Sequence, residues 1–252
     1  MRSLVLHALE GIPEVRPGDD LSSLIVAALA AAGIELAPGD VLVVAQKVVS
    51  KSEGRAVDLV DVVPSAQALE YAAVTGKDAR MIELILSEST QVLRAKHGVI
   101  VVEHRLGFVM ANAGIDQSNV ESGDERALLL PVDPDASAQR LRDGLRQACA
   151  VDVGVIVNDS FGRAWRKGTI GTALGVAGMP GLVDLRGRPD RFGRKLLITQ
   201  VGVADELAAA ASLLMGQGDE GCPAVHVRGM PYVAGEGSIR ELLRPAREDL
   251  FR

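Results

Sequence analysis

Two kinds of apolar segment alternate along the chain, and each kind predicts a different element. Short aliphatic runs bounded by Gly, Pro or Asp predict strands at residues 3–9, 41–49, 153–159 and 224–229. Longer Ala-rich or amphipathic segments predict helices at residues 20–33, 65–74, 78–89, 135–149 and 204–215. Asp19 or Asp20 can cap the first of these helices, and Asp135 or Ser137 begins the fourth. Residues 98–114 predict two further strands, joined near His104 and Gly107 in a hairpin-like arrangement.

The order of these elements is irregular, and no segment repeats. Such an order favours an α+β (mixed α/β) fold over a regular doubly wound sheet. No linker or low-complexity segment divides the 252 residues. We therefore expect a single domain over residues 1–252, built as one compact unit or as two closely packed lobes.

Composition excludes several classes of protein. The net charge is −6 and only 3% of the residues are aromatic, which argues against nucleic acid as the main partner. The longest apolar stretch, residues 24–32, is too short to cross a bilayer, and the N-terminus does not resemble a signal peptide. Cys149 and Cys222 have no metal-ligand spacing and suit a reducing compartment. We expect a cytoplasmic protein without membrane contact.

The segment VIVNDSFGRAWRKG is the first candidate site. An aliphatic strand brings Asn158, Asp159 and Ser160 to the point where a loop begins, and the carboxylate and hydroxyl oxygens suit a hard divalent cation. Arg163, Arg166 and Lys167 follow closely, so the loop can meet several phosphate oxygens. An aspartate capping a turn beside a solvated basic loop explains the spacing equally well.

Two further loops carry polar groups. Asp116 and Asn119 lie in a small-residue loop after a strand, where ordinary turn formation is the stronger explanation. The glycines of MGQGDEGC have the spacing of a dinucleotide fingerprint, but they follow a helix and precede a strand, so that interpretation fails. Their backbone N–H groups can still approach a phosphate, with Gln217, Asp219 and Glu220 facing a cation.

Lys47 and Lys51 lie near the end of the predicted strand at 41–49, with Arg55 beyond. Two explanations fit these lysines equally well: they bind phosphate, or they lie on a solvated strand edge. The chain has no P-loop sequence and no legible Ser-His-Asp or Cys-His arrangement. The four histidines are scattered, so no zinc site is predicted.

Taken in order, these segments resemble one known family. The motifs EGIP, DVLVVAQKVVSKSEGR, NAGIDQSNV, LLLPVDPDASA, VIVNDSFGRAWRKGTIGTALG, DRFGRKL and LLMGQGDEGCPAVHVRG are similar to those of the F420-0:gamma-glutamyl ligase family. The resemblance extends from about Glu10 to Ser238. The chain looks like the stand-alone ligase, without the nitroreductase-like domain of some relatives.

The resemblance implies the fold, the reaction and the partners. It implies a ligase fold forming an intertwined homodimer, with GTP and two divalent cations, Mg²⁺ or Mn²⁺. A potassium requirement would be carried over from the resemblance alone. The implied reaction adds L-glutamate to coenzyme F420-0 by gamma-linked amide bonds, through an acyl phosphate, and forms GDP and phosphate.

The resemblance also implies roles for individual residues. The nucleotide would be bound by Ile12, Pro13, Glu14, Val15, Gln46, Lys47, Lys51 and Asn119. The phosphates would be lined by Met215, Gly216, Gln217, Gly218, Asp219, Glu220, Gly221 and Cys222. The metals would be held by Asp116, Asp159, Ser160 and Gln217, the two aspartates being the catalytic residues. Gln217 stands where others have Glu, and Ser160 where some have Thr. For Arg163, Arg166 and Lys167 the resemblance gives no role, and we expect them to hold either the phosphodiester of the substrate or the charge that develops in the reaction.

Two other functions fit the same residues. A non-catalytic nucleotide-binding module would keep the lysines but does not need Asp116 and Asp159, and their presence together with Gln217 favours an enzyme. A related amide ligase acting on a different acid has the same sequence requirements. Loss of either aspartate would abolish turnover in an enzyme of this kind.

Overall fold

The fold is built around a five-stranded sheet. In the computed structural model, which describes residues 3–117, 125–231 and 235–250, the strand order is β1 (Val5–Ala8), β12 (Ala224–Arg228), β2 (Val41–Ala45), β8 (Gly154–Arg163) and β9 (Arg166–Ala177). β2 and β8 run parallel, and the other neighbouring pairs are antiparallel. Residues 41–44 and 155–157 are fully buried because the sheet is covered on both faces.

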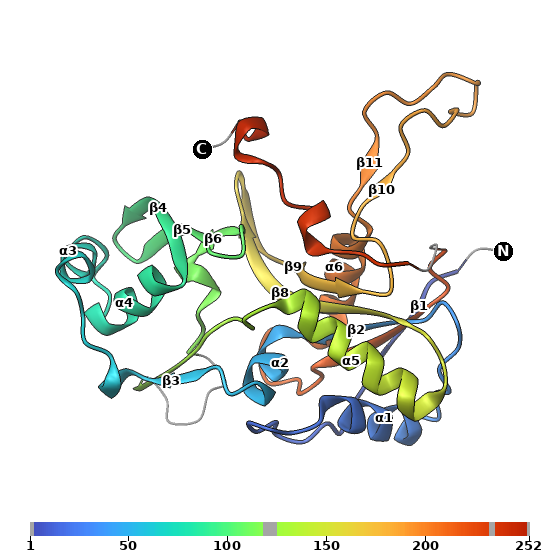
Figure 1. Cartoon of the computed structure of the whole chain (residues 1–252), viewed down its shortest axis with the longest axis horizontal. Coiled ribbons are helices and arrows are strands. Elements are labelled where there is room, and N and C mark those ends of the chain that lie inside the picture. Colours follow the sequence, from blue (N-terminus) through green and yellow to red (C-terminus); the bar gives the residue numbers. More distant parts are fainter. Residues whose placement is uncertain (1–2, 118–124, 232–234, 251–252) are drawn as a thin grey trace.

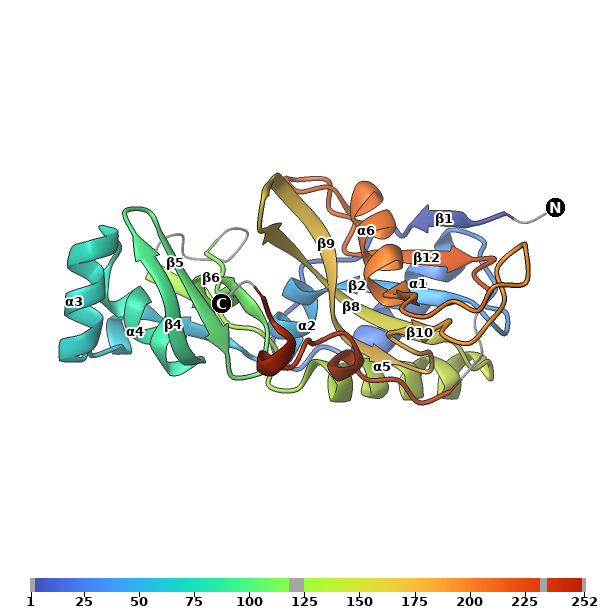
Figure 2. The same ribbon diagram turned by 90° about the horizontal axis from the view of Figure 1, so that it is seen from above.

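Three long helices cover this sheet. α5 (Pro134–Cys149), with α1 (Leu21–Ala31) packed against it, lies on one face, and α6 (Val203–Met215) lies on the other (Figures 1 and 2). Asp20 caps α1 by accepting a hydrogen bond from the Ser22 N–H, as predicted. The predicted start of α5 at Asp135 or Ser137 is slightly late, because Asp133 caps the helix and Pro134 occupies its first position.

A smaller hydrophobic cluster lies beside the main sheet, at the left of Figure 1. The strands β4 (Ser89–Lys96), β5 (Val99–His104) and β6 (Val109–Ala111) form one antiparallel sheet there, and β3 (Ala56–Asp58) pairs with β7 (Arg126–Leu128). The helices are α3 (Ala66–Thr75) and α4 (Ala79–Ser87), after the short turn η1 (Leu59–Asp61). The predicted strand pair at residues 98–114 is confirmed, whereas β4 was not predicted.

Glu88 lies at the centre of an ion-pair network in this smaller part of the chain. It accepts hydrogen bonds from Arg55 (3.2 Å) and Arg105 (3.0 Å), and the Nε2 atom of His104 lies 3.4 Å away. Burial alone would raise the pKa of Glu88, but His104 and the two arginines lower it to about 2. Arg55 also donates to the carbonyl of Leu130, which belongs to the main hydrophobic core. This network therefore ties the two hydrophobic clusters together.

Two predicted boundaries are wrong. Residues 46–52 form helix α2 (Gln46–Ser52) and do not continue the strand, because Gln46, Val49 and Ser50 turn the same face inward at helical spacing. The predicted loop after Asp159 is a strand: β8 continues to Arg163 and pairs with β9 in a long hairpin. A continuous apolar run does not distinguish a strand from the start of a helix, and a strand edge needs a partner that local sequence does not reveal.

Two peripheral segments complete the description. β10 (Val183–Asp184) and β11 (Gln200–Val201) form the base of an arm that projects from the sheet (Figure 1). The C-terminal segment carries the short turns η4 (Ile239–Glu241) and η5 (Ala246–Glu248). No helix within the described ranges is both long and apolar enough to cross a membrane. Cys149 and Cys222 are both free thiols.

Asp40 closes the sheet at the end where β2 begins. It is 1% exposed and accepts hydrogen bonds from Arg228 (2.8 Å and 2.6 Å) and from the Ala37 N–H (2.8 Å), while His226 Nε2 lies 2.9 Å from its carboxylate. Burial alone would raise the pKa of Asp40, but the hydrogen bonds from Arg228 and His226 outweigh burial and lower the pKa to about 2. The carboxylate thus stabilises the β2–β12 pairing in its charged form.

We expect the Asp40→Asn variant to lose about 2 kcal/mol of unfolding free energy at pH 7, because the lowered pKa of Asp40 measures the preference of the fold for the carboxylate. This contribution is complete above about pH 4, and it disappears as the pH falls through about 2. Urea unfolding at pH 7 and pH 3 measures both effects. The Asp184→Asn variant, in an exposed pair with Arg186, should change stability much less. Equal losses in the two variants would contradict the prediction.

Candidate functional site

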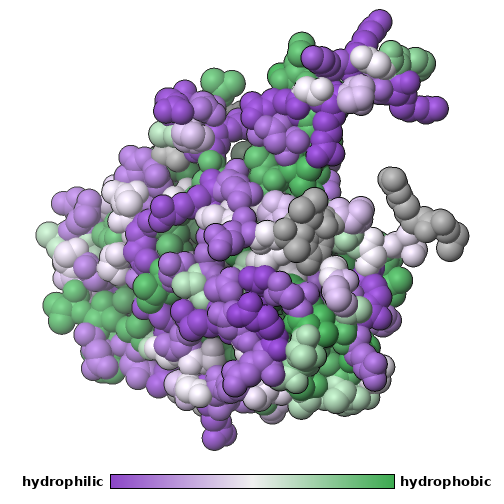
Figure 3. Space-filling model, turned by 45° about the vertical axis from the view of Figure 1, so that its right-hand side comes forward, coloured by the Kyte–Doolittle hydropathy of each residue, from purple (hydrophilic) through white to green (hydrophobic). Residues whose placement is uncertain are grey.

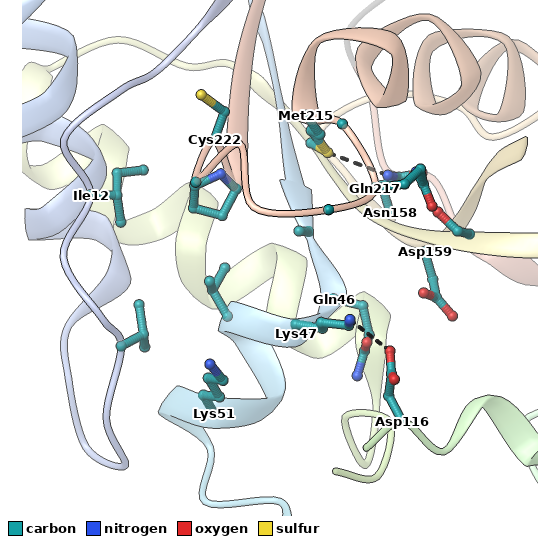
Figure 4. Close-up of a pocket in the computed structure, with 18 of the residues that line it drawn as sticks. Ile12, Gln46, Lys47, Lys51, Asp116, Asn158, Asp159, Met215, Gln217 and Cys222 are labelled. Atoms are coloured by element: carbon teal, nitrogen blue, oxygen red, sulfur yellow. Dashed lines mark hydrogen bonds and ion pairs between the residues drawn. The ribbon is translucent and has the colours of Figure 1, made fainter. Parts of the chain in front are cut away.

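An open cleft of about 650 Å³ lies at the carboxyl ends of β2 and β8. Ala45 is the partner of Asn158 in the parallel ladder, so the residues after each strand emerge side by side although they are more than 100 positions apart in the chain. The carboxyl edge of parallel strands is the usual place for a ligand in α/β sheets. Figure 4 shows side chains from several elements pointing into this space.

Most of the predicted site residues meet in this cleft. The N-terminal loop, α2, β8 and the loop after α6 supply them: Ile12, Pro13, Glu14, Val15, Gln46, Lys47, Lys51, Asp116, Asp159, Ser160, Met215, Gly216, Gln217, Gly218, Asp219, Gly221 and Cys222. Asn119 lies outside the described residues. The geometry therefore brings together groups whose individual motifs were weak.

Both cleft lysines are paired with carboxylates. Lys47 Nζ lies 2.8 Å from Asp116 Oδ2, and Lys51 pairs with Glu14 of the N-terminal loop (Figure 4 shows the first pair). Lys47 and Lys51 lie on consecutive turns of α2, so the correction from strand to helix places both on the same face. The side chain of Lys47 is 28% exposed and that of Asp116 is 31% exposed, so both can reach a ligand in the cleft.

Asp116 is positioned by an unusual turn. The turn η2 (Asn112–Gly114) precedes it, and its three residues all adopt left-handed φ angles of 54°, 52° and 65°. That conformation is unfavourable for Ala113, which lacks the freedom of glycine. The N–H and C=O of Asp116 both bond to Leu128, which fixes its backbone. Strain of this kind is typical of functional positions.

The pKa of Asp159 is raised above the ordinary value of an aspartate. Its pKa is raised to about 6, mainly by burial and also by the negative charge of Asp116, while the Ser160 N–H and Lys47 act in the opposite direction. A carboxylate in such a place is stabilised by an added cation. Asp159 lies close to Asp116 and Lys47 in the cleft (Figure 4).

The oxygen donors in the cleft fit a hard divalent cation. Asp116 and Asp159 supply two carboxylates, and Ser160 and Gln217 supply neutral oxygens. Within the described parts of the chain, no three His, Cys, Asp or Glu side chains converge on one point. Two carboxylates with neutral oxygens suit Mg²⁺ or Mn²⁺, which bind one or two carboxylates and complete their shell with water and phosphate oxygens.

The loop after α6 depends on Gly216. This residue ends the helix with a φ of 72°, and a Cβ atom there would lie 2.0 Å from the carboxylate carbon of Glu220. Glu220 accepts a hydrogen bond from the Gly218 N–H (2.8 Å). Its carboxylate therefore shapes the loop, and Glu220 is not among the cleft-lining residues.

Arg163, Arg166 and Lys167 also do not line the cleft. They lie at the tip of the β8–β9 hairpin, beyond the residues that do. The cleft includes residues for which the sequence suggested no role: Ala45, Val48, Asn158, Thr169 and Pro223. Thr169 could have been found only from the pairing of β9 with β8, which places it opposite Gly162.

Comparison with known proteins gives a consistent result. The sequence model of the F420-0:gamma-glutamyl ligase family matches residues 11–229. The chain is 48% identical over 249 residues to the coenzyme F420:L-glutamate ligase of Methanothermobacter thermautotrophicus, covering 98% of both chains. It is 45% identical to the proteins of the same name from Methanopyrus kandleri, covering 100% of both chains, and Archaeoglobus fulgidus, covering 97% of this chain and 94% of that one. The chain therefore belongs to the F420-0:gamma-glutamyl ligase family.

Proposed function

We propose that this ligase uses GTP to join L-glutamate to coenzyme F420-0 by gamma-linked amide bonds, in F420 biosynthesis. The observation that carries the proposal is the meeting of Lys47, Lys51, Asp116 and Asp159 with a glycine-rich loop at one edge of the sheet. Lysines and backbone N–H groups suit nucleotide phosphates, and the aspartates suit the cation that accompanies them. The names of the relatives support the choice of acid and amine.

The reaction needs an activated carboxylate. A carboxylate oxygen of F420-0 attacks the γ-phosphorus, the bond to the β-phosphate oxygen breaks, and GDP leaves. The amine of glutamate then attacks the acyl carbon, the C–N bond forms, phosphate leaves with the electron pair, and the amine proton passes to solvent. Lys47 and Lys51 would hold the phosphates in line for the first step.

Asp116, Asp159, Ser160 and Gln217 would hold two divalent cations, Mg²⁺ or Mn²⁺. When bound, these cations neutralise charge on the phosphate oxygens. The raised pKa of Asp159 supports this assignment, because a buried carboxylate near a second carboxylate lacks a full counter-charge.

Incubation of the protein with F420-0, L-glutamate, GTP and Mn²⁺ tests the proposal. Mass spectrometry should show the addition of one or more glutamyl units, dependent on GTP and on metal. Binding of GTP without transfer would leave the nucleotide site in place and refute the assigned acid. Absence of GTP binding would refute the proposal as a whole.

We expect Asp159→Asn to reduce ligation by at least about 100-fold, because the amide cannot supply the negative charge that the cation requires. Electron paramagnetic resonance of Mn²⁺ should show weakened metal binding in the same variant. Ser160→Thr keeps the hydroxyl and should retain most activity, whereas Ser160→Ala should not. Normal turnover by Asp159→Asn at ordinary metal concentration would refute the metal assignment.

The pairing of Lys47 with Asp116 generates a separate prediction. The ammonium group and a metal ion would compete for the same carboxylate, and a bound metal would release Lys47 towards a phosphate. The Lys47→Met variant should therefore bind Mn²⁺ more tightly than the wild type when nucleotide is absent. It should bind GTP roughly 10-fold more weakly, because one charge-assisted contact is lost.

Lys51→Met is the matched control for this experiment. Lys51 lies one turn further along α2 and pairs with Glu14, which is not an assigned metal ligand. Its loss should weaken GTP binding and leave the affinity for Mn²⁺ alone unchanged. Weaker Mn²⁺ binding in Lys47→Met than in Lys51→Met would contradict the exchange of partners.

We also propose that the protein is a homodimer. The arm that begins at β10 and ends at β11 projects from the surface (Figures 1 and 3) and exposes three large apolar side chains, Phe192, Leu197 and Ile198. Exposed apolar groups on a projecting segment support a contact with a second chain. Sedimentation should give twice the 26.5 kDa of one chain, and replacing the three side chains with serine should shift the protein towards the monomer.

A further inference from the structure

The β8–β9 hairpin extends well past the cleft. Its strands separate from the body of the sheet and rise beside the smaller part of the chain (Figures 1 and 2). The pairing of Arg163 with Arg166 is the last in the ladder, so Ala164 and Trp165 form the turn. Nothing in the proposed nucleotide and metal site explains this extension.

Trp165 has an unfavourable backbone conformation at this turn. It has a left-handed φ of 65° and is 86% exposed. A left-handed conformation is unfavourable for a bulky residue, and two-residue hairpin turns favour Asn or Gly for that reason. The high exposure of Trp165 leaves most of the indole in contact with solvent. Its indole is therefore placed as a contact surface and not as part of the core.

The tip is also strongly basic. Arg163, Arg166 and Lys167 flank Trp165, and none of them forms an ion pair with a carboxylate in the described part of the chain. Arg163 donates only a long hydrogen bond to the carbonyl of Lys167, at 3.4 Å. Three cations without carboxylate partners beside an exposed aromatic ring suit a ligand that is both anionic and aromatic.

The tip and the cleft lie within the length of one small molecule. Asp159 and Arg163 are four residues apart on one strand, which corresponds to about 13 Å. Thr169, which lies opposite Gly162 one position below the tip pairing, already lines the cleft. A ligand that reaches from Asp159 along the hairpin would therefore meet the basic residues first and Trp165 at its far end.

We propose that the hairpin tip recognises the end of the acid substrate remote from its reacting carboxylate, with Trp165 stacking on a planar aromatic ring. Arg163, Arg166 and Lys167 hold the phosphodiester that separates this ring from the carboxylate. The inference rests on the proposed function, because F420-0 is an acid of this class: its carboxylate is joined through a phosphodiester to a deazaflavin ring. Stacking on an aromatic side chain stabilises a bound planar ring whatever hydrogen-bonding groups that ring carries.

Steady-state kinetics of Trp165 variants test the inference. Trp165→Gly removes the ring and favours the same left-handed backbone, so the variant should fold at least as stably as the wild type. Its KM for F420-0 should rise about 10-fold, with kcat and the KM values for GTP and glutamate changed less than twofold. Trp165→Phe keeps a ring and should recover most of the loss. Phe192→Leu, which changes the other highly exposed aromatic side chain, should leave the KM for F420-0 unchanged.

Fluorescence gives an independent measurement. Trp165 is the only tryptophan of the chain, so all tryptophan emission reports on the hairpin tip. Addition of F420-0 should change this emission saturably, and its half-saturation should shift to higher concentration when Arg166 is replaced by Gln. GTP with Mg²⁺ alone should leave the emission unchanged.

The possible failures are distinguishable. An unchanged KM for F420-0 in Trp165→Gly, with ligation intact, would overturn the inference and leave the proposed function standing. Dissociation of a dimer by Trp165→Gly, seen in sedimentation, would show that a second chain covers the indole and would also overturn it. Absence of ligation by the wild-type protein would instead refute the proposed function.

Discussion

The parallel pairing of β2 with β8 is the constraint on which the rest of the site depends. It places the residues after Ala45 beside the residues after Asn158, and so brings α2 and the two-stranded hairpin to the same edge of the sheet. The antiparallel neighbour β12 adds the loop after α6 at this edge, since Ala224 pairs with Val44. Hydrogen bonding along three strands thus fixes the positions of groups from three distant parts of the chain, and the buried core behind them resists their displacement.

Both lysines of the cleft form ion pairs with carboxylates of the protein itself. Each lysine of α2 has its own carboxylate, one from the N-terminal loop and one from the smaller part of the chain. These pairs are half exposed, so they contribute little to stability and are easily exchanged for stronger partners. Asp159 adds a further carboxylate close to the Lys47–Asp116 pair, and its raised pKa reflects both its burial and the negative charge of Asp116.

Local sequence predicted the elements whose signals are local. The cap at Asp20, the strand of β12 and the strand pair around Gly107 were all visible, because capping and alternation depend on neighbouring residues. α2 was missed because an unbroken apolar run from Val41 fits a strand and a helix equally well. β9 was missed because Gly- and Thr-rich strands have weak propensity and depend on the partner strand.

The candidate site was predicted in part for the same reasons. The convergence of Lys47, Asp116 and Asp159 matches the residues taken from the family resemblance, although none of their motifs was convincing alone. Thr169 could not be predicted, because it enters the cleft only through its register with Gly162. Local sequence could not place Glu220, because an acidic residue in a glycine-rich loop can bind the loop's own N–H groups as readily as a cation.

Gly171 does not line the cleft, but it affects the position of one of the cleft walls. A Cβ atom there would lie 2.3 Å from the carbonyl oxygen of Ala208, so the missing side chain allows α6 to rest directly on β9. The end of that helix carries Met215 and the glycine-rich loop, which form one wall of the cleft. The position of this wall therefore depends on how closely α6 packs against β9 at Gly171. A methyl group at Gly171 would therefore push α6 away from β9 and displace the cleft wall that this helix carries.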